Sequence, residues 1–346
     1  MSNTYTAIGW NNFKKSYDKY LLLGVALIVI SFIGIQLTFD SNISIETLII
    51  RTASLTAIFL LHFILIIGPL CRINKIFLPL LYNRRHLGVT MFLFAAIHSI
   101  FSIIQFHSLG DTHPLASIFL SNTKFHTISQ FPFQVFGFFA FLIFFLMAAT
   151  SHDFWLKNLS PKFWKALHML VYLAYGLIIL HVALGILQYE NKIIYWVLLV
   201  LSFGSVSALH LIAGMKEAKW LKAQKKYVIE NGFSEVCKVS EIPDDCAKTV
   251  FIDGQNIAIF KYEEKLSAVN NVCRHQMGPI GEGKVIDGCI TCPWHGYQYL
   301  PENGQSPPPF TEKLETYELK LIKDMIWVNP NPNAEGTFVE PVKISK

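Results

Sequence analysis

The sequence predicts an α-helical membrane bundle of six transmembrane helices followed by a small all-β domain. Composition is the first reason, because 52% of the 346 residues are hydrophobic and only 15% are charged, whereas soluble domains usually carry about a quarter charged residues. The second is distribution, because every long apolar stretch precedes residue 215. The third is the pattern after Tyr227, where short β-like runs alternate with turn residues. These features exclude a disordered chain and a small disulfide scaffold.

Six apolar stretches are each long enough to cross a hydrocarbon core of roughly 30 Å. Only the fifth contains a charge, Lys165, which stands in its first turn and can extend to the interface. The first stretch precedes no small-residue cleavage site, so we expect it to be an uncleaved anchor. The predicted spans are residues 21–39, 52–70, 87–106, 131–150, 164–187 and 193–214.

Lysine and arginine residues gather at alternate ends of these spans. Fifteen lie on the side that holds the N-terminus and three on the other, and the lysine-rich and arginine-rich side of a membrane protein faces the cytoplasm. We therefore expect a protein of the bacterial inner membrane with both termini in the cytoplasm. The net charge of +5 then indicates topology and contact with membrane lipids, and no nucleic-acid partner is expected.

The composition divides the chain into four parts. Residues 1–20 form a cytoplasmic N-terminal segment and residues 21–214 form the membrane domain. Residues 215–226 are a basic linker suited to an anionic leaflet. Residues 227–346 form the β domain, with candidate strands in KTVFI, QNIAIF, KLSAVN, YELKLI and MIWVN.

The β domain contains two ligand pairs at distinctive spacings. Cys273 and His275 form a Cys-x-His pair, and after sixteen intervening residues Cys292 and His295 form a Cys-x-x-His pair. Two thiolates and two imidazoles in such loops can hold a zinc ion or a 2Fe-2S cluster. Zinc sites of this composition usually place the two cysteines in one pair and the two histidines in the other, whereas each loop here supplies one of each, which favours the cluster.

This region resembles the Rieske ferredoxin family over most of residues 232–330. The resemblance rests on EIPDD, IAIF, LSAVNNVCRHQMGPI, CPWHG and the proline loop GQSPPP. It implies that Cys273 and Cys292 bind one iron of a Rieske 2Fe-2S cluster, while His275 and His295 bind the other.

Two departures from the high-potential members of that family bear on the cluster's reduction potential. The first loop lacks an extra cysteine, so Cys289 has no evident disulfide partner, as a cytoplasmic location also suggests. Tyr297 replaces a serine that donates a hydrogen bond to the cluster in those proteins, although Tyr299 could still donate one. We therefore predict a low or intermediate potential within the Rieske range.

Histidines inside the membrane spans are candidate haem ligands, because ionisable residues are costly there. His98 in the third span and His181 in the fifth lie at comparable depths and are suited to a b-type haem. His86 and His168 lie twelve and thirteen residues nearer the cytoplasmic ends, which allows a second histidine pair about 18 to 20 Å away. Twelve or thirteen helical steps turn these side chains away from the direction of His98 and His181, which weakens the case for the second pair. The lone histidines His62 and His210 are more typical of packing residues.

The stretches NRRHLGVTMFLFAAIHSI and TSHDFWLKNLSPKFWKALHMLVYLAYGLIILH resemble the ferric reductase-like transmembrane family, over about residues 48–187. By this resemblance His98, His168 and His181 match haem ligands, whereas His86 occupies a variable position. One haem b, with a choice among three histidines, is favoured over two. No glycine-rich dinucleotide fingerprint follows a strand, so hydride chemistry within this chain is not expected.

These features predict a protein that passes single electrons between a cytoplasmic Rieske 2Fe-2S cluster and transmembrane haem b. The expected donor is a cytoplasmic reductase or ferredoxin, and the expected acceptor at the outer face is a metal ion, oxygen, a quinone or a periplasmic protein. Reverse flow is an open alternative. Another is a non-enzymatic, membrane-anchored Rieske redox sensor or docking subunit of a larger oxidoreductase complex. The outer-loop histidines His107, His113 and His126 could form a metal site, although solvated loop histidines are more common.

Overall fold

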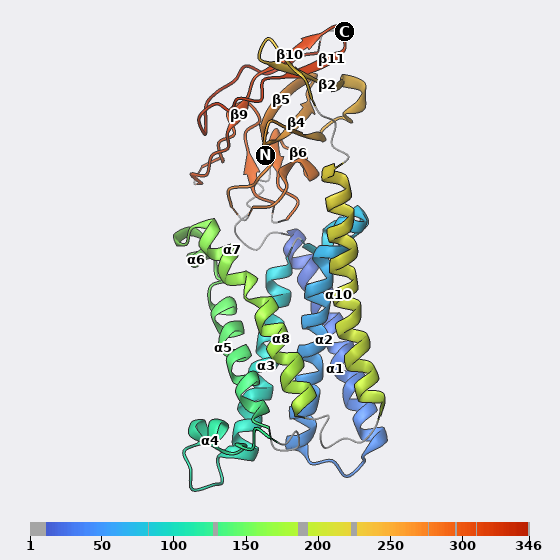
Figure 1. The fold of residues 1–346 in the computed structure, drawn as a ribbon, viewed down its shortest axis with the longest axis vertical. Helices are drawn as coiled ribbons and strands as arrows, with labels where there is room; N and C mark the ends of the chain where they lie inside the picture. The colour runs from blue at the N-terminus through green and yellow to red at the C-terminus, as the bar shows by residue number, and fades with distance from the viewer. Residues whose placement is uncertain are drawn as a thin grey trace. The chain divides into compact units, whose positions relative to one another are not determined.

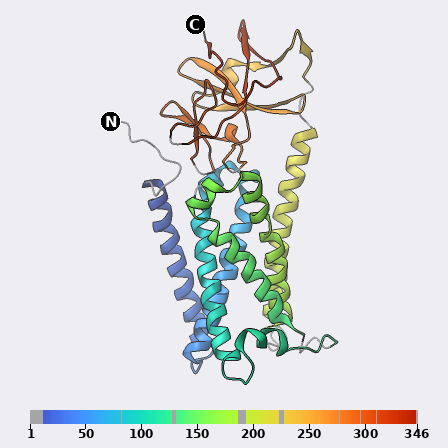
Figure 2. The ribbon, with the colours of Figure 1, turned by 90° about the vertical axis from the view of Figure 1, so that its left-hand side faces the viewer.

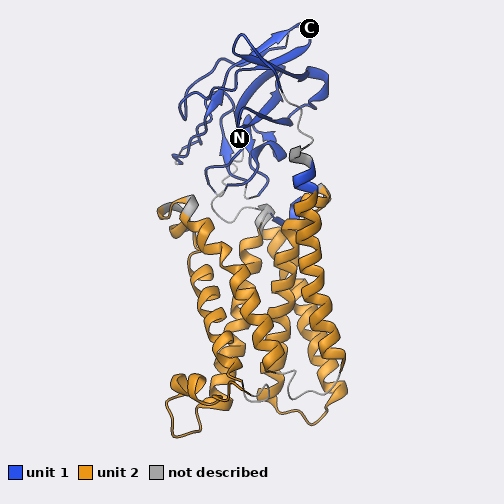
Figure 3. Ribbon diagram, in the orientation of Figure 1, with its two compact units in different colours: residues 1–11, 78–82, 216–346 blue, residues 12–77, 83–215 orange. Residues whose placement is uncertain are grey.

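The computed structural model describes residues 12–81, 83–126, 131–185, 193–222, 227–275, 277–294, 296–308 and 310–344. Most of these residues belong to one of two compact units, which Figure 3 shows in different colours. A helical unit comprises residues 12–77 and 83–215, and a mainly β unit contains the chain from residue 216 onward.

The helical unit consists of long apolar helices connected by short ones (Figure 1). Five helical segments have the length and composition to cross a membrane, namely Lys15–Phe39, Ile45–Ile73, Arg84–His107, Phe163–Leu184 and Ile193–Lys219. A sixth apolar helix, α5, has 17 residues and a length of about 26 Å. A helical membrane unit is therefore confirmed, while the number of six spans stays a prediction. The helices are α1 (Asn12–Phe39), α2 (Ile45–Ile73), α3 (Arg84–His107), α4 (Pro114–Leu120), α5 (Phe133–Ala149), α6 (Asp153–Asn158), α7 (Pro161–Met169), α8 (Val171–Leu184) and α10 (Ile193–Lys222).

Helix α2 packs along α3, and α5 packs along α8, as Figures 1 and 2 both show. Leu60, Leu61 and Ile67 of α2 are almost fully buried. In contrast, many apolar side chains of the other helices are exposed, such as Leu22 of α1 and Leu93 of α3. Such a surface is stable in lipid and would be unfavourable in water.

The fifth predicted span differs from a single helix. Helix α7 ends at Met169 and α8 begins at Val171, and between them the N–H of Leu170 donates to the carbonyl of Leu167 at 3.1 Å. This is the tighter i to i+3 hydrogen bond of a 3₁₀ turn, which changes the rotation of one helix relative to the next. The turn separates His168 from His181, so regular α-helical geometry does not relate these two side chains.

The first part of the predicted basic linker is helical. Helix α10 continues without a break through Lys222 and includes the first eight linker residues, 215–222. These residues extend the helix axis, because MKEAKWLK contains no proline and no glycine to end it. Residues 223–226 lie outside the described part of the chain.

The β unit contains three antiparallel sheets, and strands occupy all five predicted β-like runs. One sheet has the order β1-β2-β11-β10, the second β12-β5-β4-β3 with β9 also on β5, and the third β6-β7-β8. Ile257 and Ile259 of β4, together with Ile326 of β11, are fully buried in a core between strands. The strands are β1 (Ile229–Glu230), β2 (Phe233–Lys238), β3 (Ala247–Ile252), β4 (Gln255–Tyr262), β5 (Lys265–Asn270), β6 (Lys284–Ile286), β7 (Cys289–Thr291), β8 (Gln298–Tyr299), β9 (Thr316–Tyr317), β10 (Leu319–Ile322), β11 (Met325–Val328) and β12 (Val342–Lys343).

Candidate functional site: two ligand loops and a pair of membrane histidines

The two predicted cluster loops have the same backbone hydrogen-bond pattern. The N–H of Cys273 donates to Gly278, and its carbonyl accepts from the N–H of Met277, both at 2.8 Å. In the second loop the N–H of Cys292 donates to Tyr297, and its carbonyl accepts from Gly296, again at 2.8 Å. Met277 and Gly296 both have a positive φ, of 61° and 69°. Two loops of different sequence therefore present their cysteines in the same way.

Both cysteine side chains are buried where the loops meet. Cys273 is 1% exposed and Cys292 is 2% exposed. A Cβ atom on Gly278 would lie 2.9 Å from Cδ2 of Trp294 and 3.2 Å from Sγ of Cys292. Only glycine at position 278 therefore allows the first loop to approach the second this closely.

The residues of the two loops have the donor set of a 2Fe-2S cluster, in which thiolates bind one iron and imidazoles the other. His275 is 8% exposed and lies in the same loop as Cys273. His295, the fourth predicted ligand, lies outside the described residues.

Two tyrosines support the ligand loops. The ring of Tyr297 stacks on that of His275, with centroids 4.7 Å apart and an angle of 9° between the planes, and its hydroxyl donates to Glu312. The hydroxyl of Tyr299 lies 3.3 Å from Sγ of Cys273 and accepts the N–H of Arg274 at 3.0 Å. Burial, and next the negative charge of Cys273, raise the pKa of Tyr299 well above its ordinary value. The hydroxyl is therefore neutral and can donate a hydrogen bond to the thiolate, as the sequence suggested.

No disulfide joins any two of the six cysteines. Cys289 is half-buried, and burial, followed by the negative charges of Glu302 and Asp287, raises its pKa. A raised pKa keeps this thiol protonated and unreactive. The structure thus contains no bridge of the kind found beside high-potential clusters.

In the helical unit, the structure brings His98 and His181 together. Their ring centroids are 6.4 Å apart, and the ring planes are 77° apart. Two imidazoles on opposite sides of one iron have centroids roughly 6 Å apart, since each metal–nitrogen bond is about 2 Å and each ring nitrogen lies about 1.2 Å from its ring centre. The separation therefore matches a bis-histidine haem.

Backbone carbonyls from other helices orient these two rings. Nδ1 of His98 lies 3.2 Å from the carbonyl oxygen of Ile50 in α2, and Nδ1 of His181 lies 3.0 Å from that of Phe133 in α5. A carbonyl oxygen only accepts, so each Nδ1 carries the proton and each Nε2 keeps its lone pair for a metal. Gly137 of α5 makes room for this arrangement, because a Cβ there would lie 2.7 Å from Nδ1 of His181.

The structure does not bring His86 and His168 together in the same way. Nδ1 of His86 lies 2.9 Å from the carboxylate of Asp18 in α1. The side-chain amide of Asn83 donates to the same carboxylate at 2.7 Å. His168 stacks on Trp164, with centroids 3.7 Å apart. Its Nδ1 lies 3.0 Å from the Trp164 carbonyl oxygen. Each side chain therefore has partners of its own, and this geometry favours one haem over two.

Four further histidines have local contacts. Nδ1 of His62 bonds to the carbonyl of Ile58, and His210 bonds to that of Val206. His107 bonds to Ser117, and Nδ1 of His113 caps the N-terminus of α4. The sequence favoured packing for His62 and His210 and a solvated position for the outer-loop histidines.

Three features of the candidate sites were not anticipated from the sequence. They are Gly137 beside His181, the carbonyl oxygens that orient His98 and His181, and ion pairs of Arg274 with Glu315 and Glu335. A glycine within the phenylalanine-rich stretch FQVFGFF was the only available signal, because a backbone carbonyl or a remote carboxylate leaves no mark in a motif.

Comparison with known proteins finds a matching family for the helical unit and another for the β unit. The family described as "Rieske [2Fe-2S] domain" matches residues 232–318, and the family described as "Ferric reductase like transmembrane component" matches residues 52–179. The biphenyl dioxygenase ferredoxin subunit of Pseudomonas sp. is 32% identical over 92 residues, which cover 26% of this chain and 84% of that protein. The 3-phenylpropionate/cinnamic acid dioxygenase ferredoxin subunit of Photorhabdus laumondii is 34% identical over 91 residues, which cover 26% and 85%. The anthranilate 1,2-dioxygenase ferredoxin subunit of Burkholderia cepacia is 31% identical over 74 residues, which cover 21% and 68%.

Proposed function

Because the chain belongs to the Rieske [2Fe-2S] family through residues 232–318 and carries a ferric reductase like transmembrane component at residues 52–179, we propose that it carries single electrons between a 2Fe-2S cluster and a b-type haem. The two families show a membrane protein with a 2Fe-2S domain and an electron-transfer role. The pairing of His98 with His181 is the observation that supports the haem half.

The residues of the β unit have distinct tasks in this proposal. Cys273 and Cys292 supply thiolates to one iron, and His275 and His295 supply imidazoles to the other. Tyr299 donates a hydrogen bond to the Cys273 sulfur, which disperses negative charge from the reduced centre. Burial of both cysteines excludes water from the thiolates.

The residues of the helical unit hold the second group. His98 and His181 present Nε2 from α3 and α8, and the Ile50 and Phe133 carbonyls fix the rings in that orientation. Both groups, when bound, supply one-electron redox chemistry. No proton or hydride needs to move with the electron, in keeping with the absence of a dinucleotide fingerprint from the sequence.

The orientation in the membrane and the redox partners are inferred from the distribution of lysine and arginine and from the relatives. The lysine and arginine bias supports a cytoplasmic β unit in a bacterial inner membrane. The matched relatives are ferredoxin subunits of dioxygenases, so we propose a cytoplasmic reductase or ferredoxin as the electron donor. A metal ion, oxygen, a quinone or a periplasmic protein would receive the electron at the outer face.

Electron passage can be tested with the full chain in proteoliposomes that enclose ferricyanide. Reduced ferredoxin added outside should first reduce the cluster, then the haem, and finally bleach the enclosed ferricyanide. The variant His181→Ala should keep the cluster and lose the haem and the bleaching. His210→Phe serves as its control, because His210 bonds only to neighbouring groups of the bundle. Protein loaded with both groups that transfers no electron would refute the conduit, and protein without Soret absorbance would favour the sensor alternative.

A further inference from the structure

The side chain of Arg274, between the ligands Cys273 and His275, forms ion pairs with two carboxylates. Its Nη2 lies 2.5 Å from Oε1 of Glu335 and 3.6 Å from Oε1 of Glu315. The Arg274 side chain is only a third exposed, so solvent screens these contacts incompletely. Glu335 lies beyond the residues that match the Rieske family, which end at 318. A segment outside the family's domain thus contacts a cluster loop.

Glu315 is fixed to the strand that leads into the same loop. Its Oε2 accepts from the side-chain amide of Asn270 at 2.7 Å, and Oδ1 of Asn270 accepts the N–H of Val272 at 2.9 Å. The backbone N–H of Asn270 also donates to the Glu315 carbonyl at 2.9 Å. One carboxylate is therefore tied to both the end of β5 and the guanidinium.

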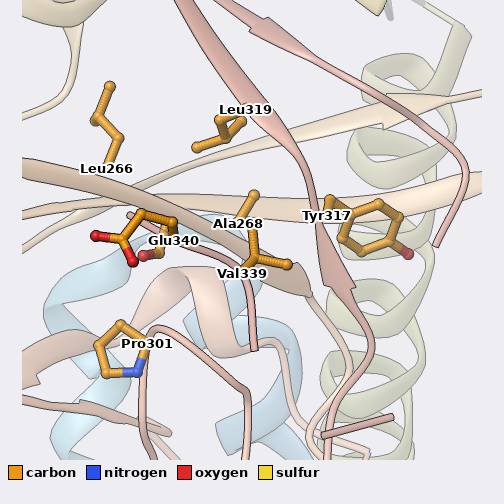
Figure 4. Close-up of a pocket in the computed structure, with 8 residues that line it drawn as sticks. Leu266, Ala268, Pro301, Tyr317, Leu319, Val339 and Glu340 are labelled. Atoms are coloured by element: carbon orange, nitrogen blue, oxygen red, sulfur yellow. The ribbon is translucent and has the colours of Figure 1, made fainter. Parts of the chain in front are cut away.

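The C-terminal segment, residues 329–344, holds Glu335 in place from both sides. Before it, the N–H of Asn333 donates to the Thr316 carbonyl at 2.9 Å, and after it the N–H of Gly336 donates to Leu314 at 2.9 Å. Farther along, Val339 and Glu340 line a small pocket with Leu266 and Ala268 of β5, as Figure 4 shows. The segment is thus part of the folded domain, and its contact with Arg274 is a fixed one.

We propose that Glu335 is a positioning residue for the cluster: together with Glu315 it holds the Arg274 guanidinium against the first ligand loop and offsets its positive charge. A cation near the cluster stabilises the added electron and raises the reduction potential, whereas a carboxylate lowers it. The pairing therefore keeps the potential in the lower part of the Rieske range. This inference rests on the 2Fe-2S cluster of the proposed function but is independent of the haem and of the direction of flow.

Redox titration of the full-length protein, followed by paramagnetic resonance of the reduced cluster, tests the inference. Glu335→Gln should raise the midpoint potential, because it leaves the cation less compensated. Arg274→Gln should lower it, and the double variant should lie between the two. Glu340→Gln is the matched control, since Glu340 is an exposed glutamate of the same segment and lines the pocket of Figure 4. This control should leave the potential unchanged.

The opposite signs distinguish electrostatics from simple loss of structure. Equal potentials for Glu335→Gln and Glu340→Gln would overturn the inference, as would shifts of Glu335→Gln and Arg274→Gln in the same direction. If Glu335→Gln lowered the cluster content, the double variant should restore it by removing the partly compensated cation, and failure to restore it would also overturn the inference. A protein with a normal cluster signal but no electron transfer to haem would refute the proposed function and leave this inference intact.

Discussion

The proposed haem site can be tested through Gly137, a residue that is not one of its proposed ligands. A Cβ at this position would lie 2.7 Å from Nδ1 and 2.8 Å from Cε1 of His181, whereas ordinary contacts begin at 3.4 Å. In Gly137→Ala the ring or the helix must therefore move by about 0.7 Å. Overpacking of this kind costs about 1 to 3 kcal/mol, and it also strains the hydrogen bond to the Phe133 carbonyl.

If the whole overpacking free energy of Gly137→Ala opposes haem binding, the affinity of the protein for haem should fall by roughly 5- to 150-fold. The assay is titration of the haem-free protein with haemin, followed by Soret absorbance, with a pyridine haemochrome measurement of stoichiometry. Gly176→Ala on α8 is the control, because a Cβ there meets nothing within 4 Å. Equal haem affinity and equal low-spin spectra for the two variants would refute the assignment of His181 as a ligand.

Three further predictions concern both sites. We expect one haem per chain by pyridine haemochrome assay, lost in His98→Ala and kept in His168→Ala, because the rings of His98 and His181 face each other; two haems per chain would contradict this. Tyr299→Phe should lower the cluster potential by about 20 to 60 mV, the equivalent of one hydrogen bond of 0.5 to 1.5 kcal/mol, and an unchanged redox titration would exclude the hydroxyl as a donor. Burial and nearby carboxylates raise the pKa of Cys289, so its alkylation by iodoacetamide at pH 8 should be slower than that of a free thiol and should accelerate at higher pH; Cys289→Ser should leave the cluster potential unchanged.

The features that sequence reasoning identified are those with a local cause. The runs KTVFI and QNIAIF were predicted as strands from their local pattern, and the structure pairs them around Asp253 and Gly254, with Ile252 opposite Gln255. The cluster loops were identified by the spacing of their ligands, since each loop must fold around its own cysteine.

Features with a remote cause were not predictable in the same way. Helix α2 begins at Ile45, seven residues before the predicted span, because Ser44 caps it by accepting from the N–H of Thr47. The predicted span began only at residue 52 because Arg51 interrupts the apolar stretch. The turn at Leu170 has neither proline nor glycine to mark it. Glu335 is distant from Arg274 along the chain, and only the fold of the C-terminal segment brings them together.

The carbonyl partners of His98 and His181 have a consequence for how the protein is assembled. Each imidazole is oriented by a helix other than its own, so the ring pair involves α2, α3, α5 and α8 together. The site therefore cannot exist in a partly inserted chain and is complete only when all four helices have docked. Haem delivered earlier would meet unoriented rings, and haem delivered later would meet rings already held for it. Cofactor insertion should thus be a late step of biogenesis, and bound haem would mark chains whose helices have been correctly assembled.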